Sequence, residues 1–285
     1  MNLKEFLINS HFDAILFDAS GVIYSNQGIV LGASETIQFS QNQASTYLVT
    51  NNSYSYPSYI NDHLRTQANI NIPETHIISS GHGLATDPKI LEIITNKNIY
   101  FLGRDFSKQY ILDAPIKSIS PSANNADVII LANFTPGTND SQIDQIIYAA
   151  NQNPSTPIIC CNPDIKIRSG ESLLHVMGYY AQEIQKRIPQ KIYWYGKPYK
   201  NFSNYVEVVL KKHNITPSKK VIFFDDNIKN VVNMQNDIGI AGCWVKQTGI
   251  FYEDDTHSLI EKYGLPSCII DSIHLDNNII INKTN

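Results

Sequence analysis

The feature that most constrains this chain is a pair of apolar segments that run directly into acidic residues. The first, AILF at 14–17, is followed by Asp18, and the second, VIFF at 221–224, is followed by Asp225 and Asp226. Short apolar runs of this kind predict buried strands of a parallel sheet. Ligands of open parallel sheets bind at the carboxyl ends of the strands, so we expect these acids to face one another across a crevice.

Helical and strand patterns alternate between and around these two segments. The alternation predicts β-α-β units with right-handed crossovers, and therefore an α/β fold built on a parallel sheet. The further predicted strands cover 46–50, 99–103, 127–132, 157–161 and 242–246, and helical spacing covers 33–43, 57–67 and 141–152.

Two glycine-containing segments indicate that the chain has two domains. A chain of 285 residues can form one large domain or two of ordinary size. The segments at 77–83 and 188–198 have the character of hinges, although each signal is weak alone. We therefore predict a core domain over 1–78 and 190–285, with a separate α/β domain over 79–189 inserted into it.

The composition of the chain argues against a disordered protein and against a nucleic-acid-binding protein. Hydrophobic residues make up 42% of the chain and charged residues 17%, which excludes global disorder, and a net charge of −4 argues against nucleic acid as a partner. The four cysteines lack CxxC spacing, so we expect buried, reduced thiols and not a zinc site. The N-terminus lacks the basic region of a signal peptide, and no segment approaches the ~20 apolar residues of a membrane span, so we expect a cytoplasmic protein.

The acids at the strand ends point to a cation and to phosphate chemistry. Carboxylates that crowd together repel one another unless a cation lies between them, and oxygen ligands of this kind suit Mg²⁺. Thr50 and Asn51 lie at the end of a predicted strand and can hydrogen-bond a phosphate oxygen. Lys197 lies between a glycine and a proline and can bind phosphate as a point charge. The alternative is that the acids are helix caps and that Lys197 is an exposed loop lysine.

This ordered set resembles the haloacid dehalogenase superfamily of phosphatases. More narrowly, it is similar to the class IIA subgroup, which includes nucleotide monophosphatases and p-nitrophenyl phosphatases. The matching residues are Asp18 for the first motif, Thr50 within LVTNNS (48–53) for the second, Lys197 within GKP (196–198) for the third, Asp225 and Asp226 for the fourth, the CNPD segment at 161–164, and Gly249 after the fourth motif.

The resemblance implies a Rossmann-like core, an inserted α/β cap and a covalent mechanism. Asp18 would attack phosphorus and become an aspartyl-phosphate, with Lys197 holding it in place. A magnesium ion would be bound by Asp18, the backbone carbonyl of Ser20 and Asp225, with Asp226 beside them. The resemblance also assigns phosphate binding to Thr50, Asn51 and Lys197, and substrate contacts in the cap to Asn162 and Asp164.

The chain departs from the superfamily pattern at one catalytic position. Ser20 stands where a second aspartate normally protonates the leaving group, a contribution worth typically ~10²–10⁴-fold in rate. Phe224 and Asn230 also depart from the subgroup's fourth motif. His82, near the first predicted hinge, is a candidate to replace the missing acid, and the alternative is that it is a surface histidine. His175 is expected on an apolar helical face, as a core or pocket-wall residue.

The predicted function is therefore a Mg²⁺-dependent phosphatase of reduced activity that acts on a small phosphorylated metabolite. A catalytically silent phosphate- and metal-binding sensor or scaffold is one alternative, and a phosphotransferase is another. Nucleotide, sugar phosphate and pyridoxal phosphate all stay open as substrates. The resemblance also allows a homodimer formed through the cap.

Overall fold

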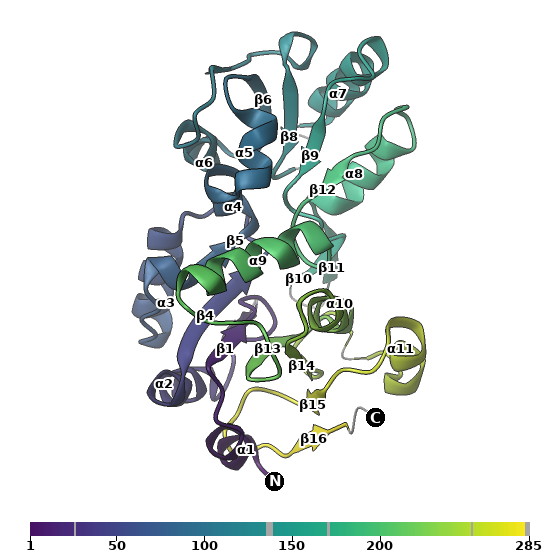
Figure 1. The fold of residues 1–285 in the computed structure, drawn as a ribbon. Helices are drawn as coiled ribbons and strands as arrows, with labels where there is room; N and C mark the ends of the chain where they lie inside the picture. Colours follow the sequence, from purple (N-terminus) through teal and green to yellow (C-terminus); the bar gives the residue numbers. More distant parts are fainter. Residues whose placement is uncertain (26, 135–138, 170–171, 252, 283–285) are drawn as a thin grey trace.

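Two β-sheets, each flanked by helices, organise the chain into a lower core lobe and an upper cap lobe (Figure 1). The computed structural model describes residues 1–25, 27–134, 139–169, 172–251 and 253–282. Both ends of the described chain lie in the core lobe, whereas the middle of the sequence forms the cap lobe, so the cap is inserted into the core (Figure 1).

The core sheet has seven strands in the order β16-β15-β14-β13-β1-β4-β5. All neighbours are parallel except β15 and β16, which are antiparallel. The strands are β1 (Ala14–Phe17), β4 (Ser45–Thr50), β5 (Ile77–Ser79), β13 (Val221–Asp225), β14 (Ala241–Val245), β15 (Cys268–Ile270) and β16 (Ile279–Ile281). The helices of this lobe are α1 (Leu3–Ser10), α2 (Ala33–Gln43), α3 (Pro57–Ala68), α9 (Lys200–Lys212), α10 (Ile228–Ile238) and α11 (Thr256–Tyr263).

The cap sheet has five parallel strands in the order β12-β9-β8-β6-β7. These are β6 (Asn98–Leu102), β7 (Ser118–Ile119), β8 (Val128–Leu131), β9 (Ile158–Cys160) and β12 (Tyr193–Trp194). The helices of this lobe are α4 (Ser80–Thr86), α5 (Pro88–Ile94), α6 (Gln109–Leu112), α7 (Asp140–Gln152) and α8 (Met177–Gln185).

Small elements complete both lobes. Two antiparallel pairs are formed by β2 (Tyr24–Ser25) with β3 (Gly28–Ile29) and by β10 (Lys166–Ser169) with β11 (Ser172–His175). Short 3₁₀ turns cover η1 (Glu74–His76), η2 (Asp105–Lys108) and η3 (Ala123–Asn125).

The central strands are apolar on both faces because helices cover both sides of the sheet. Every residue of β1 is buried, and Phe17 stacks on Phe224 of the adjacent strand with ring centroids 5.1 Å apart. Each such side chain contributes about 1.5–3 kcal/mol when it leaves water. One apolar cluster contains Leu16 of the core together with Phe101 and Ile159 of the cap, so buried side chains join the two lobes.

The α/β fold and its parallel sheets confirm the sequence prediction, and the strands and helices predicted over stated residue ranges agree with the structure to within about two residues. The segment expected to be a hinge forms β5 and the start of α4. Gly81 and Gly83 permit close packing there, because a Cβ atom at Gly81 would lie 2.6 Å from the Tyr110 ring. The domain boundaries at 78/79 and 189/190 stay predictions, and β12 of the cap sheet lies beyond the second of them.

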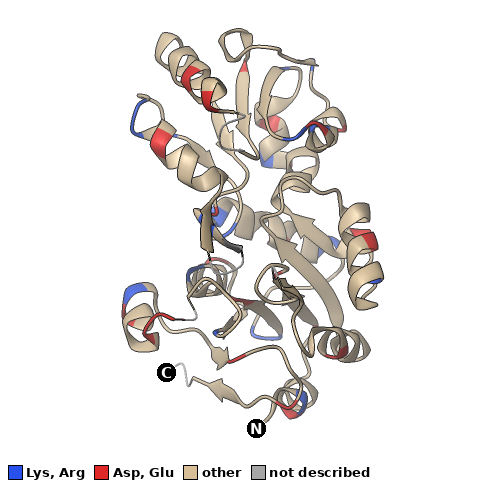
Figure 2. Cartoon of the chain, turned by 180° about the vertical axis from the view of Figure 1, so that it is seen from behind, with Lys and Arg blue, Asp and Glu red and all other residues tan. Residues whose placement is uncertain are grey.

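Acidic and basic residues alternate over both lobes in the view of Figure 2 and form no broad basic face there. The adjacent thiols Cys160 and Cys161 are buried in different apolar clusters, as their neighbouring positions in a strand predict. Within the described ranges, no helix combines the length and the hydropathy that crossing a bilayer would require.

Candidate active site

One pocket of about 400 Å³ lies where the carboxyl ends of the strands of both sheets meet. The core lobe supplies residues that follow β1, β4, β13 and β14, and the cap supplies residues that follow β6, β8 and β9. The position agrees with the rule that parallel sheets bind ligands at their carboxyl ends. The lining includes Asp18, Ser20, Thr50, Asn51, Lys197, Asp226 and Gly249 around the core, and Arg104, Phe134, Asn162, Asp164, Lys166 and His175 from the cap.

A buried lysine connects two of the strand-end acids. Lys197 is only 2% exposed, and its Nζ lies 2.6 Å from Asp18 Oδ1 and 2.7 Å from Asp225 Oδ2. The same ammonium donates to the carbonyl oxygen of Val49 at 2.9 Å. Burial alone lowers the pKa of Lys197, but the two carboxylates outweigh burial and hold that pKa above its usual value. The lysine is therefore a fixed positive charge beside Asp18.

The carboxyl groups of this cluster carry more negative charge than one lysine offsets. One carboxylate oxygen from each of Asp18, Asp225 and Asp226 lies within 4.8 Å of the corresponding oxygens of the other two. Burial raises the pKa of Asp18 to about 7, although Lys197 opposes that rise. Burial, with the neighbouring acids, also raises the pKa of Asp226 well above its usual value. A divalent cation would relieve this repulsion, and buried carboxylate oxygens are the ligands that Mg²⁺ prefers.

The two adjacent aspartates point to different partners. Asp225 is fully buried, and it accepts hydrogen bonds from Lys197, from the backbone of Asn227 at 2.8 Å and from the side chain of Asn230 at 3.2 Å. Asp226 lines the pocket, and among the described residues its carboxylate accepts only from the backbone of Ile250, at 3.2 Å. The geometry thus favours Asp226 as the metal ligand and Asp225 as the anchor of Lys197.

Two glycines leave room for the Asp226 carboxylate. A Cβ atom at Gly21 would lie 2.5 Å from Asp226 Oδ2, and one at Gly249 would lie 2.6 Å from Asp226 Cγ. Gly21 also has φ of +82°, a backbone conformation that residues with a side chain rarely adopt. A cradle that any larger residue would fill therefore holds this carboxylate beside Asp18.

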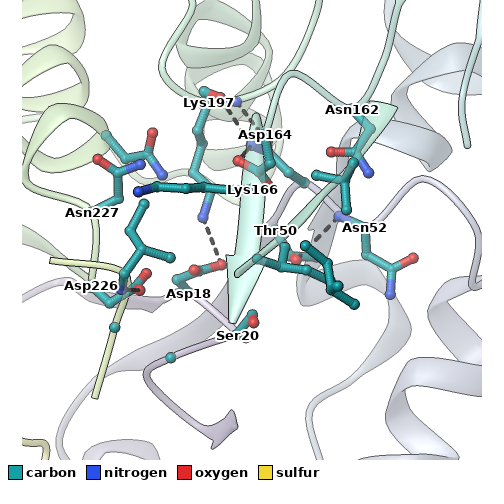
Figure 3. Close-up of a pocket in the computed structure, with 18 of the residues that line it drawn as sticks. Asp18, Ser20, Thr50, Asn52, Asn162, Asp164, Lys166, Lys197, Asp226 and Asn227 are labelled. Atoms are coloured by element: carbon teal, nitrogen blue, oxygen red, sulfur yellow. Dashed lines mark hydrogen bonds and ion pairs between the residues drawn. The ribbon is translucent and has the colours of Figure 1, made fainter. Parts of the chain in front are cut away.

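Ser20 and Thr50 present hydroxyl groups to the pocket. Ser20 is exposed there, and its side chain has no hydrogen bond to another described residue. Thr50 is 5% exposed, and its Oγ1 accepts from the backbone of Asn52 at 3.2 Å (Figure 3). The hydroxyl proton of Thr50 remains free to be donated to a phosphate oxygen.

Asn51 joins the core lobe to the cap lobe. Its Oδ1 accepts from the backbone of Lys197 at 2.7 Å, and its Nδ2 donates to Lys197 O and to Asp164 Oδ1, both at 2.9 Å. Its amide is therefore occupied by protein contacts, which favours a positioning role over direct phosphate binding by this side chain. Asn162 is 8% exposed, and its Oδ1 has no hydrogen-bond partner among the described residues.

Neither histidine occupies the position of the missing acid. His82 lies in α4 against the Tyr56 ring, with centroids 5.8 Å apart, and it does not line the pocket. The expectation that His175 lies on a helical face is wrong, because this residue ends β11, where it is exposed and lines the pocket. Its segment pairs with β10 as a hairpin, which the apolar pattern alone does not distinguish from a helix.

Sequence analysis missed Arg104 and Lys166, two basic side chains on the cap side of the pocket. A usable signal was present, since Arg104 comes shortly after a predicted strand and Lys166 follows Asp164 by two positions. Residues at the strand ends of the cap are candidate site residues just as those of the core are, because both sheets open on the same pocket.

The site can now be compared with known proteins. Residues 15–117 match the family of haloacid dehalogenase-like hydrolases. The comparison with curated protein sequences gives no match.

Solved structures match over nearly the whole chain. A "possible sugar phosphatase" of the haloacid dehalogenase superfamily from Cytophaga hutchinsonii has a TM-score of 0.80 at 21% identity, covering 96% of this chain and 97% of that one. The p-nitrophenyl phosphatase from Archaeoglobus fulgidus has 0.76 at 17% identity, covering 92% and 97%. A glycerol phosphate phosphatase from Mycobacterium tuberculosis, in complex with calcium, has 0.77 at 13% identity, covering 98% and 77%. These likenesses establish the fold, and together with the family match they confirm the resemblance found in the sequence.

Proposed function

We propose that this chain, a haloacid dehalogenase-like hydrolase by its matched residues 15–117 and by its fold, is a Mg²⁺-dependent phosphomonoesterase that acts through an aspartyl-phosphate on Asp18. The observation that carries the proposal is the contact between Asp18 and Lys197 at 2.6 Å on the floor of the pocket between the two lobes. The phosphatases named among the similar structures support the same reaction class.

The residues present fit a magnesium ion. The buried oxygens of Asp18 and Asp226 lie within 4.8 Å of each other, and the glycine cradle around Asp226 holds its carboxylate in place. Asp18, Asp226 and the backbone carbonyl of Ser20 would hold the ion. Asp225 would contribute indirectly, because it anchors Lys197. When bound, Mg²⁺ offsets negative charge on the oxygens of the transferring phosphoryl group.

The nucleophile of the reaction is a carboxylate oxygen of Asp18. It attacks phosphorus, the bond from phosphorus to the ester oxygen breaks, and the leaving group departs as an alkoxide or phenoxide that takes its proton from water. Lys197 orients Asp18 and favours its ionised form against the effect of burial, and Thr50 donates a hydrogen bond to a phosphate oxygen. A water molecule then attacks the phosphorus of the aspartyl-phosphate, which releases phosphate and restores Asp18.

The serine at position 20 lowers the rate that we expect for ester hydrolysis. A hydroxyl is too weak an acid and too weak a base to serve the leaving group or the water near neutral pH, so the step that normally gains ~10²–10⁴-fold from general acid–base catalysis is unassisted. We expect turnover to be best for esters with acidic leaving groups. The substrate would be a small phosphorylated metabolite, bound without a macromolecular partner.

Hydrolysis of p-nitrophenyl phosphate, with and without Mg²⁺, tests this proposal, because its leaving group needs little protonation. Metal-dependent turnover that is lost in Asp18→Asn would support a phosphatase. Equal background rates in the two proteins would reject the phosphatase and favour a phosphate-binding sensor. Adding alcohols as acceptors in the same assay separates hydrolysis from transfer to an acceptor other than water.

A further inference from the structure

Two basic side chains on the cap side of the pocket are not neutralised by the protein. Arg104 follows β6 and Lys166 opens β10, and both line the pocket. Among the residues that the structure describes, no carboxylate lies within 4.0 Å of either cation. Lys197 differs from both, since it is paired with two aspartates. The two cap cations therefore carry positive charge that a ligand could use.

Arg104 is held in place without losing its hydrogen-bond donors. Its guanidinium lies over the ring of Tyr54, 5.1 Å from the centroid, and Tyr54 also lines the pocket. Ser107 donates to the carbonyl oxygen of Tyr54 at 3.2 Å and so joins the two segments. The adjacent acid, Asp105, is paired with Lys108 at 2.7 Å. A stacked guanidinium with free donors is well suited to bind a carboxylate or a phosphate.

Lys166 is positioned by the hairpin of the cap. It pairs with His175 in the β10–β11 register, and Figure 3 shows its side chain extending across the pocket in the direction of Asn227. The nearest acid along the chain, Asp164, is turned to Asn51, from which its Oδ1 accepts at 2.9 Å. Lys166 is half-buried, so an ion pair formed there would be screened less than one on the surface.

We infer that Lys166 and Arg104 form a subsite for a second anionic group, so that the preferred substrates are small phosphomonoesters whose leaving group carries a carboxylate or a second phosphate. This inference rests on the proposed function, because Asp18, Lys197 and the metal then take the phosphate that reacts. The two cap cations line the same pocket as Asp18 and Lys197. A pocket of about 400 Å³ limits that substrate to a compact metabolite.

Matched pairs of esters test the inference. 3-Phosphoglycerate and glycerol 3-phosphate differ by one carboxylate, and fructose 1,6-bisphosphate and fructose 6-phosphate differ by one phosphate. Each ester is measured as a competitive inhibitor of p-nitrophenyl phosphate hydrolysis by the natural protein with Mg²⁺. We expect the more anionic member to bind about tenfold more tightly in at least one pair, and the pair that responds identifies the anion. Inhibition constants within twofold of each other in both pairs would overturn the inference.

Single neutral variants locate the subsite. In Arg104→Gln and in Lys166→Gln, the ratio of inhibition constants should fall to about twofold or less, whereas Lys191→Gln should keep the full ratio. Lys191 is an exposed cap lysine that does not line the pocket, so it controls for the change in net charge. A tenfold ratio that persists in both pocket variants would assign the preference to another part of the protein and overturn the inference.

A binding measurement separates failure of the subsite from failure of the proposed function. Titration calorimetry of the same esters into Asp18→Asn needs no turnover. If p-nitrophenyl phosphate is not hydrolysed but the ester pairs still differ tenfold in affinity, the catalytic proposal fails and the anion subsite stands. If hydrolysis is Mg²⁺-dependent while the pairs bind equally, the subsite fails and the catalytic proposal stands.

Discussion

The ammonium of Lys197 lies 2.6 Å from Oδ1 of Asp18, and both side chains are buried at the base of the pocket. Lys197 comes from the segment after β12 of the cap sheet, whereas Asp18 directly follows β1 of the core sheet. The contact therefore holds a buried cation against the proposed nucleophile, and the proposed chemistry depends on it.

Removing the Lys197 ammonium should cost both stability and activity. In Lys197→Met, two buried carboxylates lose their shared cation, and breaking a buried ion pair in this way typically costs about 3–5 kcal/mol. We expect a fall of about 3 kcal/mol in the free energy of unfolding in the absence of Mg²⁺, together with loss of p-nitrophenyl phosphate turnover. Urea denaturation measures the first, with Lys191→Met as the control. A variant as stable and as active as the natural protein would contradict the role given to Lys197.

Asp225 and Asp226 should differ when each is changed to asparagine. Mg²⁺ at about 100 times its dissociation constant stabilises a protein by about 2.7 kcal/mol. We expect that stabilisation to be lost in Asp226→Asn, which removes a charged ligand from the pocket. Asp225→Asn should lower stability without metal but should still respond to Mg²⁺, because this side chain anchors Lys197. Thermal unfolding with and without Mg²⁺ distinguishes the two, and the reverse pattern would show that Asp225 is the ligand.

Gly249→Ala should weaken the metal site without altering any of its ligands. The new methyl group would lie 2.6 Å from Asp226 Cγ, so the carboxylate must move. We expect the Mg²⁺ concentration for half-maximal activity to rise about tenfold, a change equivalent to about 1.4 kcal/mol. Gly28→Ala is the comparison, because Gly28 has a positive φ of +106° but open space around it. Equal effects of the two substitutions would point to general backbone strain.

Ser20→Asp should restore the missing proton carrier. Ser20 is exposed to the pocket, and its hydroxyl makes no hydrogen bond to another described residue. The longer side chain of an aspartate can therefore extend into the pocket. We expect turnover of glycerol 3-phosphate to rise by at least about tenfold and that of p-nitrophenyl phosphate to rise less, since only the alkoxide needs protonation. Ser20→Asn controls for size and polarity. Equal gains in both variants would show that the gain does not come from proton transfer. No gain in either variant would show that the serine does not limit the rate.

The strand ends could be predicted well from the sequence, because each buried apolar run is followed directly by polar residues of the site. Each run of apolar residues that is buried on both faces predicts a strand, and the polar residue after it falls at the carboxyl edge, as for Asp18 and Asp226. The pattern could not say which of Asp225 and Asp226 faces the pocket. That choice depends on the orientation of the backbone as the strand ends and on donors from Asn230 and Lys197.

The cap was harder to predict for a physical reason. Its pocket residues follow short strands whose pairing depends on distant segments, and its hairpin carries exposed apolar residues, with Ile167 at 39% and Leu174 at 49% exposure. The local apolar pattern therefore predicts a helix around His175, where the structure has a hairpin strand. The role of Asn51 as a clamp was also hidden, because its partners lie far away in the sequence.

Chemical trapping of the intermediate tests the central claim most directly. The natural protein would be mixed with p-nitrophenyl phosphate and Mg²⁺, quenched with borohydride, digested and examined by peptide mass spectrometry, since borohydride reduces an aspartyl-phosphate to homoserine. The account predicts homoserine at position 18 and unmodified Asp225 and Asp226. Turnover of the ester with Asp18 unmodified, or with the modification at another acid, would contradict it.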